Sequence, residues 1–405
     1  MKMFFPEHYE LVPGREVSSR LERLAAGLEA EAALVSWPAD LFYLSGSNQF
    51  GYLLIPNDKE PLFLVRRDPE RAAAESPLRV AALDGFWDLG SMVRDHLGRL
   101  PRSLALALDT TPAREAKALA VQMAEPEIKD LGPLLLELRA LKSEWEIERL
   151  EQAGRIGAQA YARLPALFRP GMTELELAGT VTACLMKLGS QVYTRTRSSV
   201  GEMYPYHLTS GKNGLRRSRV EAPFGGLGQS PSFPQGPSLE PIGPGEPILV
   251  DFASCWQGYI VDVTRMFSWG PPPKQALEAY QALVTIEADL MEQLKDGAQG
   301  EAVFDRTVAL ARELGFGREF LGQGRSANTF VAHGVGLEIS EPPYVAKART
   351  EILRTGQTLA LELKMVLPGL GAVGLEDTVV VTDSGARSLT PHDRRFIDLT
   401  GDGSR

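Results

Sequence analysis

The first part of the chain, from residue 15 to about residue 140, alternates short apolar runs with stretches of mixed polar and apolar residues. This alternation is typical of an α/β unit. We predict strands at 33–37, 41–44, 52–55, 61–65 and 103–108, and a helix at 112–123. No cluster of histidine or cysteine lies in this part of the sequence. We therefore interpret it as a scaffold, or as a domain that controls the access of a substrate.

Two capping boxes mark the starts of helices in the second part of the chain. Ser143 is followed by Glu146, and Thr173 by Glu176, in each case just before a helical pattern. In a capping box the two side chains bond to each other's backbone and so stabilise the first turn. The second of these helices is predicted to extend to about residue 188.

The first capping box also indicates a domain boundary near Lys142, which gives domains at 1–141 and 142–405. Two further helical patterns, at 274–294 and 300–314, precede the last set of strands. A helix pair followed by strands, twice over, predicts a duplicated catalytic domain. In such an architecture both halves can contribute ligands to one central site.

A predicted hairpin at 248–267 carries two acids, Asp251 and Asp262, among apolar residues, and Gln257-Gly258 offers its turn. On neighbouring strands the two carboxylates face the same interior, where they repel each other and an unpaired charge is costly. A cation must compensate them. Arg265 could do so for one acid, and a pair of divalent metal ions could do so for both. The alternative is two acids at strand edges that form salt bridges with arginines.

The segment 223–247, just before the hairpin, is rich in glycine and proline. It is either a linker or the wall of a pocket. Long irregular segments inside a compact domain often serve function. We therefore expect this segment to border the site.

The composition excludes several classes of partner and location. The chain has 405 residues, 44% of them hydrophobic, which is enough for a large core and two domains. A net charge of −9 and a pI near 5.3 argue against a nucleic-acid-binding surface. No apolar run approaches the length of a membrane span, and proline and charges interrupt the start of the chain before a signal-peptide core. With only Cys184 and Cys255, no disulfide framework is indicated, and we expect a cytoplasmic protein.

Three more candidate residues follow the hairpin. His333 lies between small residues in the run 332–338, Glu362 lies inside an apolar strand, and Glu376 precedes the apolar residues 379–381. Each of these residues alone is weak evidence for a metal site, because a lone histidine is usually a core residue and a buried acid usually has a basic partner. Together with Asp251 and Asp262 they give four carboxylates and one imidazole, with few basic residues close in sequence to neutralise them.

The order and spacing of these five residues resemble the creatinase/prolidase/methionine aminopeptidase superfamily, the pita-bread metallopeptidases, and more closely its Xaa-Pro peptidase branch. The resemblance covers essentially the whole chain: SWPADLFYLSG is similar to the opening of a creatinase-type N-terminal domain, and RALKSEWEIERLEQA to the helix that enters the catalytic domain. It implies an α/β (α+β) fold, in which a creatinase-type N-terminal α/β domain precedes a pita-bread catalytic domain with pseudo-twofold symmetry.

The resemblance also implies roles for the five residues. Asp251 chelates one metal ion, Asp262 and Glu376 bridge two ions, and His333 and Glu362 complete the second. Carboxylate and imidazole ligands suit Mn, Zn, Co or Fe, and we favour two Mn²⁺ ions. Such a pair would activate a bridging water, and Glu362 is implied to accept its proton.

The chain departs from the family at two places. Active peptidases of the superfamily usually carry a histidine directly before the acid that here is Glu341, where this chain has Ser340. They usually carry another shortly after a Ser-Gly-x-Asn motif, where this chain continues with Arg216 and Arg217. Losing one donor to the oxyanion typically costs about a hundred- to a thousandfold in turnover.

Other residues could replace the missing histidines. His207, just upstream of the motif, is a candidate catalytic residue, and Ser340, Arg216 and Arg217 are candidates for binding substrate, the arginines through its carboxylate. The alternatives are a structural histidine and a solvated loop.

Three functions remain open from the sequence. The first is a dinuclear metallohydrolase acting as an Xaa-Pro aminopeptidase or dipeptidase on a small peptide. The second keeps the metals but acts on a non-peptide C–N bond, as a hydrolase or lyase of the creatinase or ectoine-hydrolase kind. The third is a catalytically silent binding protein. The resemblance further implies a homodimer.

Overall fold

The structure is a computed structural model that describes residues 9–197, 203, 206–220, 222–322, 324 and 327–400. The chain divides into two compact units, Met1–Arg139 and Ala140–Arg405. Each unit has its own hydrophobic core. In the part of the chain that the structure describes, no helix is long and apolar enough to cross a membrane.

The first unit is built on one six-stranded sheet with the order β4-β3-β2-β1-β5-β6. Its strands are β1 (Ala32–Val35), β2 (Gly51–Pro56), β3 (Leu62–Val65), β4 (Arg79–Ala82), β5 (Ser103–Leu106) and β6 (Glu127–Asp130). Its helices are α1 (Gly14–Gly27), α2 (Pro38–Ser45), α3 (Pro69–Glu75), α4 (Leu89–Leu97), α5 (Ala113–Gln122) and α6 (Gly132–Ala140). Strand β1 pairs antiparallel with β2 and parallel with β5, so the sheet is mixed.

The strand predicted at 41–44 is wrong, because these residues belong to helix α2. Pro38 occupies the first turn, where its missing N–H costs nothing, and Gly46 ends the helix in the left-handed conformation with φ 75°. Helix α2 is buried on most sides, so its sequence is mostly apolar and shows no clear helical period, and its buried acid Asp40 pairs with Arg139. The other predicted strands and the helix at 112–123 are confirmed to within a few residues.

The described residues of the second unit form three sheets, with the orders β11-β10-β12-β15-β16, β13-β14 and β17-β9-β8-β7. Its strands are β7 (Tyr206–Ser210), β8 (Pro247–Trp256), β9 (Tyr259–Ser268), β10 (Phe330–Gly334), β11 (Glu341–Ala346), β12 (Thr358–Leu361), β13 (Leu363–Leu367), β14 (Gly371–Leu375), β15 (Thr378–Thr382), β16 (Gly385–Ser388) and β17 (Ile397–Asp398). The predicted hairpin is confirmed as β8 and β9, which pair antiparallel around Gln257-Gly258.

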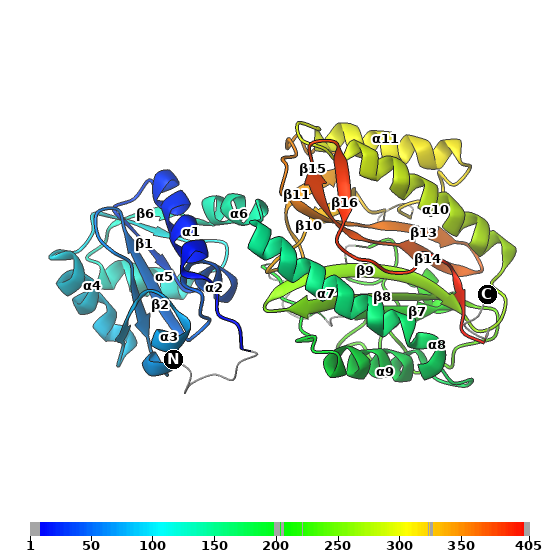
Figure 1. Cartoon of the computed structure of the whole chain (residues 1–405), viewed down its shortest axis with the longest axis horizontal. Helices are drawn as coiled ribbons and strands as arrows, with labels where there is room; N and C mark the ends of the chain where they lie inside the picture. The colour runs from blue at the N-terminus through cyan, green and yellow to red at the C-terminus, as the bar shows by residue number, and fades with distance from the viewer. Residues whose placement is uncertain are drawn as a thin grey trace. The chain divides into compact units, whose positions relative to one another are not determined.

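Helices cover the sheets of this unit from two sides (Figure 1). They are α7 (Glu144–Ala162), α8 (Leu164–Leu167), α9 (Glu174–Lys187), α10 (Lys274–Gln293) and α11 (Gly300–Glu313). Helix α7 packs on β8 and β9, and α9 on β7. Helix α10 packs on β13, β14 and β16, and α11 on β10 and β11. Each half of the unit thus combines a helix pair with strands, as the sequence predicts.

Both predicted capping boxes are present. The Ser143 side chain accepts a hydrogen bond from the backbone N–H of Glu146 at the start of α7, and Thr173 does the same for Glu176 at the start of α9. In each case the glutamate side chain accepts a hydrogen bond from the backbone N–H of the capping residue. These interactions fix the points at which the two helices begin.

Candidate metal centre

The hairpin places its two acids on one face of the sheet. Asp251 lies opposite Thr264, and Asp262 lies opposite Ala253. Because side chains alternate between the faces of a strand, Asp251 and Asp262 point to the same side. Both are buried, with 8% and 9% of their surface exposed.

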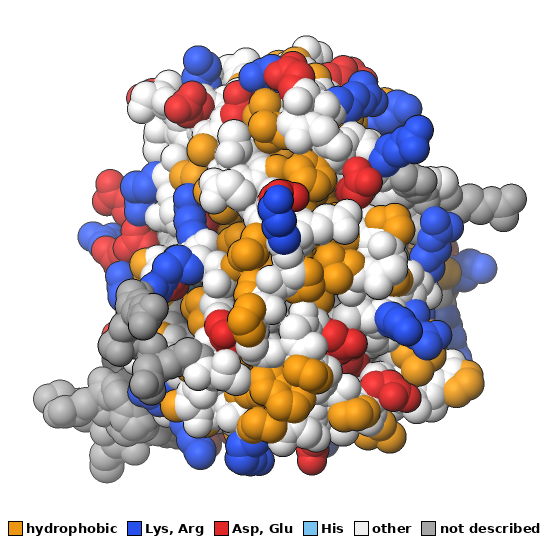
Figure 2. Space-filling view, turned by 90° about the vertical axis from the view of Figure 1, so that its right-hand side faces the viewer, with side chains coloured by type: hydrophobic (Ala, Val, Ile, Leu, Met, Phe, Trp, Pro, Cys, Tyr) orange, Lys and Arg blue, Asp and Glu red, His pale blue; other side chains and the backbone are white. Residues whose placement is uncertain are grey.

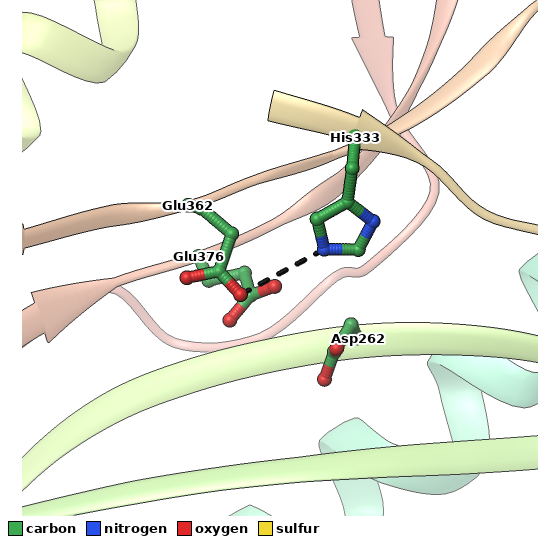
Figure 3. Close-up of side chains that lie close together, drawn as sticks. All are labelled: Asp262, His333, Glu362 and Glu376. Carbon is green, nitrogen blue, oxygen red and sulfur yellow. Dashed lines mark ion pairs between the residues drawn. The ribbon is translucent and has the colours of Figure 1, made fainter. Parts of the chain in front are cut away.

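The other three predicted ligands come from separate elements. His333 lies on β10, Glu362 lies between β12 and β13, and Glu376 follows β14. Ligand atoms of Asp262, His333, Glu362 and Glu376 lie within 4.8 Å of one another. Figure 3 shows the imidazole and the two glutamates pointing toward one another, while Asp262 approaches from the hairpin. Nε2 of His333 is 3.8 Å from Oε1 of Glu362.

The backbone fixes the orientation of the His333 ring. Nδ1 lies 3.1 Å from the carbonyl oxygen of Gly334, which can only accept, so Nδ1 is the protonated nitrogen of this pair. Nε2, which faces Glu362, is thereby left as an acceptor in the neutral ring. This arrangement is the usual one for a histidine that binds a metal ion.

A lysine that the sequence analysis missed lies among the acids. Nζ of Lys364 is 2.9 Å from Oδ2 of Asp251 and 3.5 Å from Oε2 of Glu376, and it also donates a hydrogen bond to Oε2 of Glu362. The sequence carries a signal for it, since Lys364 is two residues after Glu362 and side chains at this spacing share one face of a strand. The expectation that few basic residues would be near the acids in sequence overlooked this residue.

The electrostatics of the cluster favour an added cation. Burial raises the pKa of Asp262 to about 8, and the charges of Asp251 and Glu362 act in the same direction. Burial and the neighbouring acids also hold the pKa of Glu376 well above its usual value. Burial has the same tendency at Glu362, but Lys364 and His333 outweigh it and lower the pKa of that carboxyl. Negative charge thus exceeds positive charge in the cluster, and a divalent ion would relieve the excess.

The residues fit such an ion. Oε1 of Glu376 is buried and has no hydrogen-bond partner among the described residues, whereas Oε2 accepts a hydrogen bond of 2.7 Å from Oγ1 of Thr264. A buried carboxylate oxygen without a donor is costly unless a cation meets it. Three carboxylates with one imidazole form a donor set that suits Mn²⁺, Zn²⁺, Co²⁺ or Fe²⁺.

Arg265 does not neutralise either acid of the hairpin. Its Nη2 pairs with Oδ1 of Asp377 at 2.8 Å, and its Nη1 donates to the backbone carbonyl oxygens of Thr264 and Glu376. Arg265 follows Thr264 on β9 and therefore faces the opposite side of the sheet. It joins β9 to the segment that carries Glu376, so it holds two candidate ligands in place from behind.

His207 lies beside the cluster. On β7 it is paired directly with Asp251 of β8, which brings their side chains to one face. Nε2 of His207 lies 3.0 Å from the carbonyl oxygen of Gly225, and its ring stacks on Phe224. Removal of the ring from water lowers the pKa of His207. The imidazole is thus neutral, and its protonated nitrogen is engaged by the glycine- and proline-rich segment.

The remaining candidate residues are Ser340 and two arginines. Oγ of Ser340 is 3.3 Å from the hydroxyl of Tyr344 on β11, and Tyr344 is the direct partner of His333 across β10 and β11. Arg216 and Arg217 are exposed, and the backbone of Arg216 bonds to Asn213, Gly225 and Gly226.

A second buried acid organises the loops next to the site. Glu174, at the start of α9, accepts hydrogen bonds from the backbone N–H and hydroxyl of Ser210, from Nδ2 of Asn213, and from the N–H and hydroxyl of Ser238. It therefore joins the Ser-Gly-x-Asn motif to the glycine- and proline-rich segment. This role is not visible in the sequence, because Glu174 has the pattern of an ordinary residue in the first turn of a helix.

Comparison with known proteins agrees with this architecture. Residues 18–141 match the creatinase/prolidase N-terminal domain, and residues 148–383 match the metallopeptidase family M24. A Xaa-Pro dipeptidase of Pyrococcus furiosus is 24% identical over 395 residues, covering 94% of this chain and 100% of that protein. A probable dipeptidase of Mycobacterium tuberculosis is 27% identical over 403 residues, covering 95% and 98%.

Solved structures share the fold. The Xaa-Pro dipeptidase from Bacillus anthracis superposes with a TM-score of 0.80 at 22% identity, covering 94% of this chain and 99% of that one. The X-Pro aminopeptidase from Thermotoga maritima gives 0.78 at 23% identity, covering 93% and 99%. These matches confirm the predicted fold class and the family resemblance. The chain belongs to metallopeptidase family M24, as a peptidase-type hydrolase with a creatinase/prolidase N-terminal domain.

Proposed function

We propose that this protein is a metal-dependent peptidase that cleaves the bond before proline in a small peptide. The observation that carries the proposal is the convergence of Asp262, His333, Glu362 and Glu376 within 4.8 Å in a largely buried site. The relatives named Xaa-Pro dipeptidase support proline as the residue after the cut.

The four converging residues would hold a divalent ion, for which we favour Mn²⁺. When bound, such an ion supplies Lewis-acid polarisation and an acidified water. We assign the role of proton acceptor to Glu362, as the family resemblance implies, and its carboxyl is ionised at neutral pH because Lys364 and His333 lower its pKa. His207 acts as a positioning residue in this proposal, since it holds Gly225 next to Asp251.

A non-peptide amide is the second candidate substrate, and Ser340 favours it. A hydroxyl that contacts Tyr344 stands where active peptidases of the resemblance carry a histidine. In either case the substrate is a small molecule. We assign Ser340, Arg216 and Arg217 to substrate binding only as part of this proposal, with the two exposed arginines meeting the carboxylate of an approaching substrate.

The test is turnover of the metal-free protein after separate addition of Mn²⁺, Co²⁺, Zn²⁺ and Fe²⁺. The panel consists of Xaa-Pro dipeptides, longer Xaa-Pro peptides, creatine and N-acetylated diamino acids. We expect hydrolysis of an Xaa-Pro peptide with Mn²⁺, and a loss of about a hundredfold or more in kcat for Glu362→Gln. Glu313→Gln, at an exposed position on α11, is the matched control and is expected to keep full activity.

Two outcomes would change the proposal. Hydrolysis of creatine or of an N-acetylated diamino acid, with every Xaa-Pro peptide left intact, would establish the non-peptide function. No turnover of any compound by protein that has bound metal would refute both candidates and leave a binding role.

We also propose a homodimer in the cytoplasm. Figure 2 shows hydrophobic side chains gathered along the centre of one face of the molecule, between charged groups, as expected of an interface. Cys184 and Cys255 are both free and buried, which fits a reducing compartment. Light scattering during gel filtration tests the dimer, and a monomer at micromolar concentration would contradict it.

A further inference from the structure

The acids of the metal centre differ in their cationic neighbours. Asp251 is bonded to the ammonium of Lys364 through Oδ2 at 2.9 Å. Asp262, Glu362 and Glu376 converge with His333. Asp251 lies outside this four-residue group, although it shares one face of the hairpin with Asp262.

The two glutamates divide their oxygens in the same way. Oε2 of Glu362 accepts from Lys364, whereas Oε1 is the oxygen nearest to Nε2 of His333. Oε2 of Glu376 is within 3.5 Å of the ammonium and accepts from Thr264, whereas Oε1 has no hydrogen-bond partner in the described structure. One set of oxygens is therefore bound to a cation that the chain supplies itself, and the other set is available to an ion.

We propose that the Lys364 ammonium permanently fills one cation position of this acidic site, so that the protein holds a single divalent ion on Asp262, His333, Glu362 and Glu376. This inference rests on the proposed function as a metal-dependent hydrolase. It departs from the family resemblance, which implies two ions with Asp251 as a ligand of one of them.

The lysine is built into the site. Its side chain is only 3% exposed, and its backbone lies in β13, where Lys364 pairs with Gly374 of β14. A Cβ at Gly374 would lie 2.8 Å from Cδ1 of Leu249 and 3.3 Å from Cγ of Lys364. Glycine at this position therefore leaves the room in which the stem of the lysine packs.

The position of the ammonium leaves no room for a second ion. Four carboxylates with one lysine and one divalent ion carry one net negative charge, and a second divalent ion would turn this into one net positive charge, so the net charge alone does not decide between one ion and two. The placement of the charges decides, because a second ion would need Asp251 and Glu376 and would therefore lie against the ammonium. Like charges at such separations repel strongly in a buried site. A metal ion also needs its carboxylate oxygens at about 2.0–2.2 Å, and Lys364 already occupies these oxygens.

The experiment counts ions. The metal-free protein is incubated with excess Mn²⁺ and gel-filtered, and Mn²⁺ per chain is measured by elemental analysis and by electron paramagnetic resonance, which separates an isolated Mn²⁺ from an exchange-coupled pair. We expect one isolated ion in the wild-type chain and in Asp251→Asn. We expect none in Asp262→Asn, and a coupled pair in Lys364→Ala. The control Lys274→Ala, at an exposed position on α10, is expected to match the wild type.

The number of bound ions distinguishes a failure of this inference from a failure of the proposed function. Two ions in the wild-type chain would overturn the inference and leave the proposed function intact, whereas no bound ion would overturn the proposed function as well. A folded Lys364→Ala chain with one ion would show that the lysine does not hold the second position. If that variant does not fold, Asp251→Asn decides, because loss of its ion would make Asp251 a ligand and refute the inference.

Discussion

Replacing Glu174 with glutamine tests whether this one carboxylate organises the loops beside the metal centre. Glu174 is fully buried and receives five hydrogen bonds from three residues, Ser210, Asn213 and Ser238. Glutamine has nearly the same shape, but it replaces one acceptor oxygen with an NH₂ group that can only donate. The substitution therefore changes the hydrogen bonding and leaves the packing almost unaltered.

The expected loss of stability follows from the hydrogen-bond donors that would lose their acceptor. The hydroxyls of Ser210 and Ser238 can turn and accept from the new NH₂, but a backbone N–H cannot. One carboxylate oxygen receives the N–H of Ser210 and the other that of Ser238, so either orientation of the amide leaves one buried N–H without an acceptor. An orphaned buried donor costs about 2 kcal/mol. Burial raises the pKa of Glu174, which means that keeping its charge inside the protein costs free energy. Glutamine carries no charge and avoids this cost, and the saving offsets the weakening of the hydrogen bonds that remain.

The assay is thermal unfolding of the metal-free protein at pH 8. We expect Glu174→Gln to lower Tm by roughly 4–8 °C, from about 2–4 °C per kcal/mol for a unit of this size. Hydrogen exchange of the amides at 225–239 is expected to become faster. The control is Glu176→Gln on the same helical turn, where the side chain is exposed and glutamine also completes a capping box. Equal Tm values for the two variants would refute the reasoning.

Two further predictions concern stability. His392 is buried with its pKa lowered to about 3, mainly by burial, so below its unfolded pKa of about 6.5 the unfolded chain takes up a proton that the folded chain does not. The free energy of unfolding that depends on this residue therefore falls by about 2 kcal/mol between pH 7.5 and pH 5. In urea unfolding, His392→Leu should lose less stability than the wild type over this pH range. The control His96→Gln, in the first unit, should lose as much as the wild type. Ser143→Ala removes the cap of α7 and should cost about 1 kcal/mol in the same assay, and an unchanged midpoint would show that water replaces the cap.

The elements that the sequence predicted well are those whose signals are local. The hairpin β8–β9 combines apolar runs with a turn dipeptide, and each capping box needs only four residues. Helix α2 was missed because tertiary burial made it apolar on most sides, which removes the period that distinguishes a helix from a strand. The buried hairpin was still recognised, because its turn dipeptide and its length supply a signal that does not depend on exposure, and helix α2 has no such signal.

The candidate ligands could be predicted as a set, but their neighbours could not. Lys364 meets Asp251 across 113 residues, a contact that no local pattern encodes. The contact between Lys364 and Glu362 could have been expected, because the two residues are two apart in the sequence. However, Glu362 lies at the break between β12 and β13, where the alternation of side chains along a strand is a weak guide. The sequence could also have shown that Arg265 does not neutralise Asp262, because a spacing of three residues on a strand puts the two side chains on opposite faces.

The distribution of the four converging residues over the sheets bears on how the protein folds. Asp262 belongs to the four-stranded sheet, His333 to the five-stranded sheet, and Glu362 and Glu376 to the junctions between the five-stranded and two-stranded sheets. None of these sheets can form the site alone, and the contacts between them join residues far apart in the chain, which are slow to form. The ion therefore has no complete site until the sheets have docked. Capture of metal would then mark the end of folding of this unit, and its rate would report the slowest assembly step.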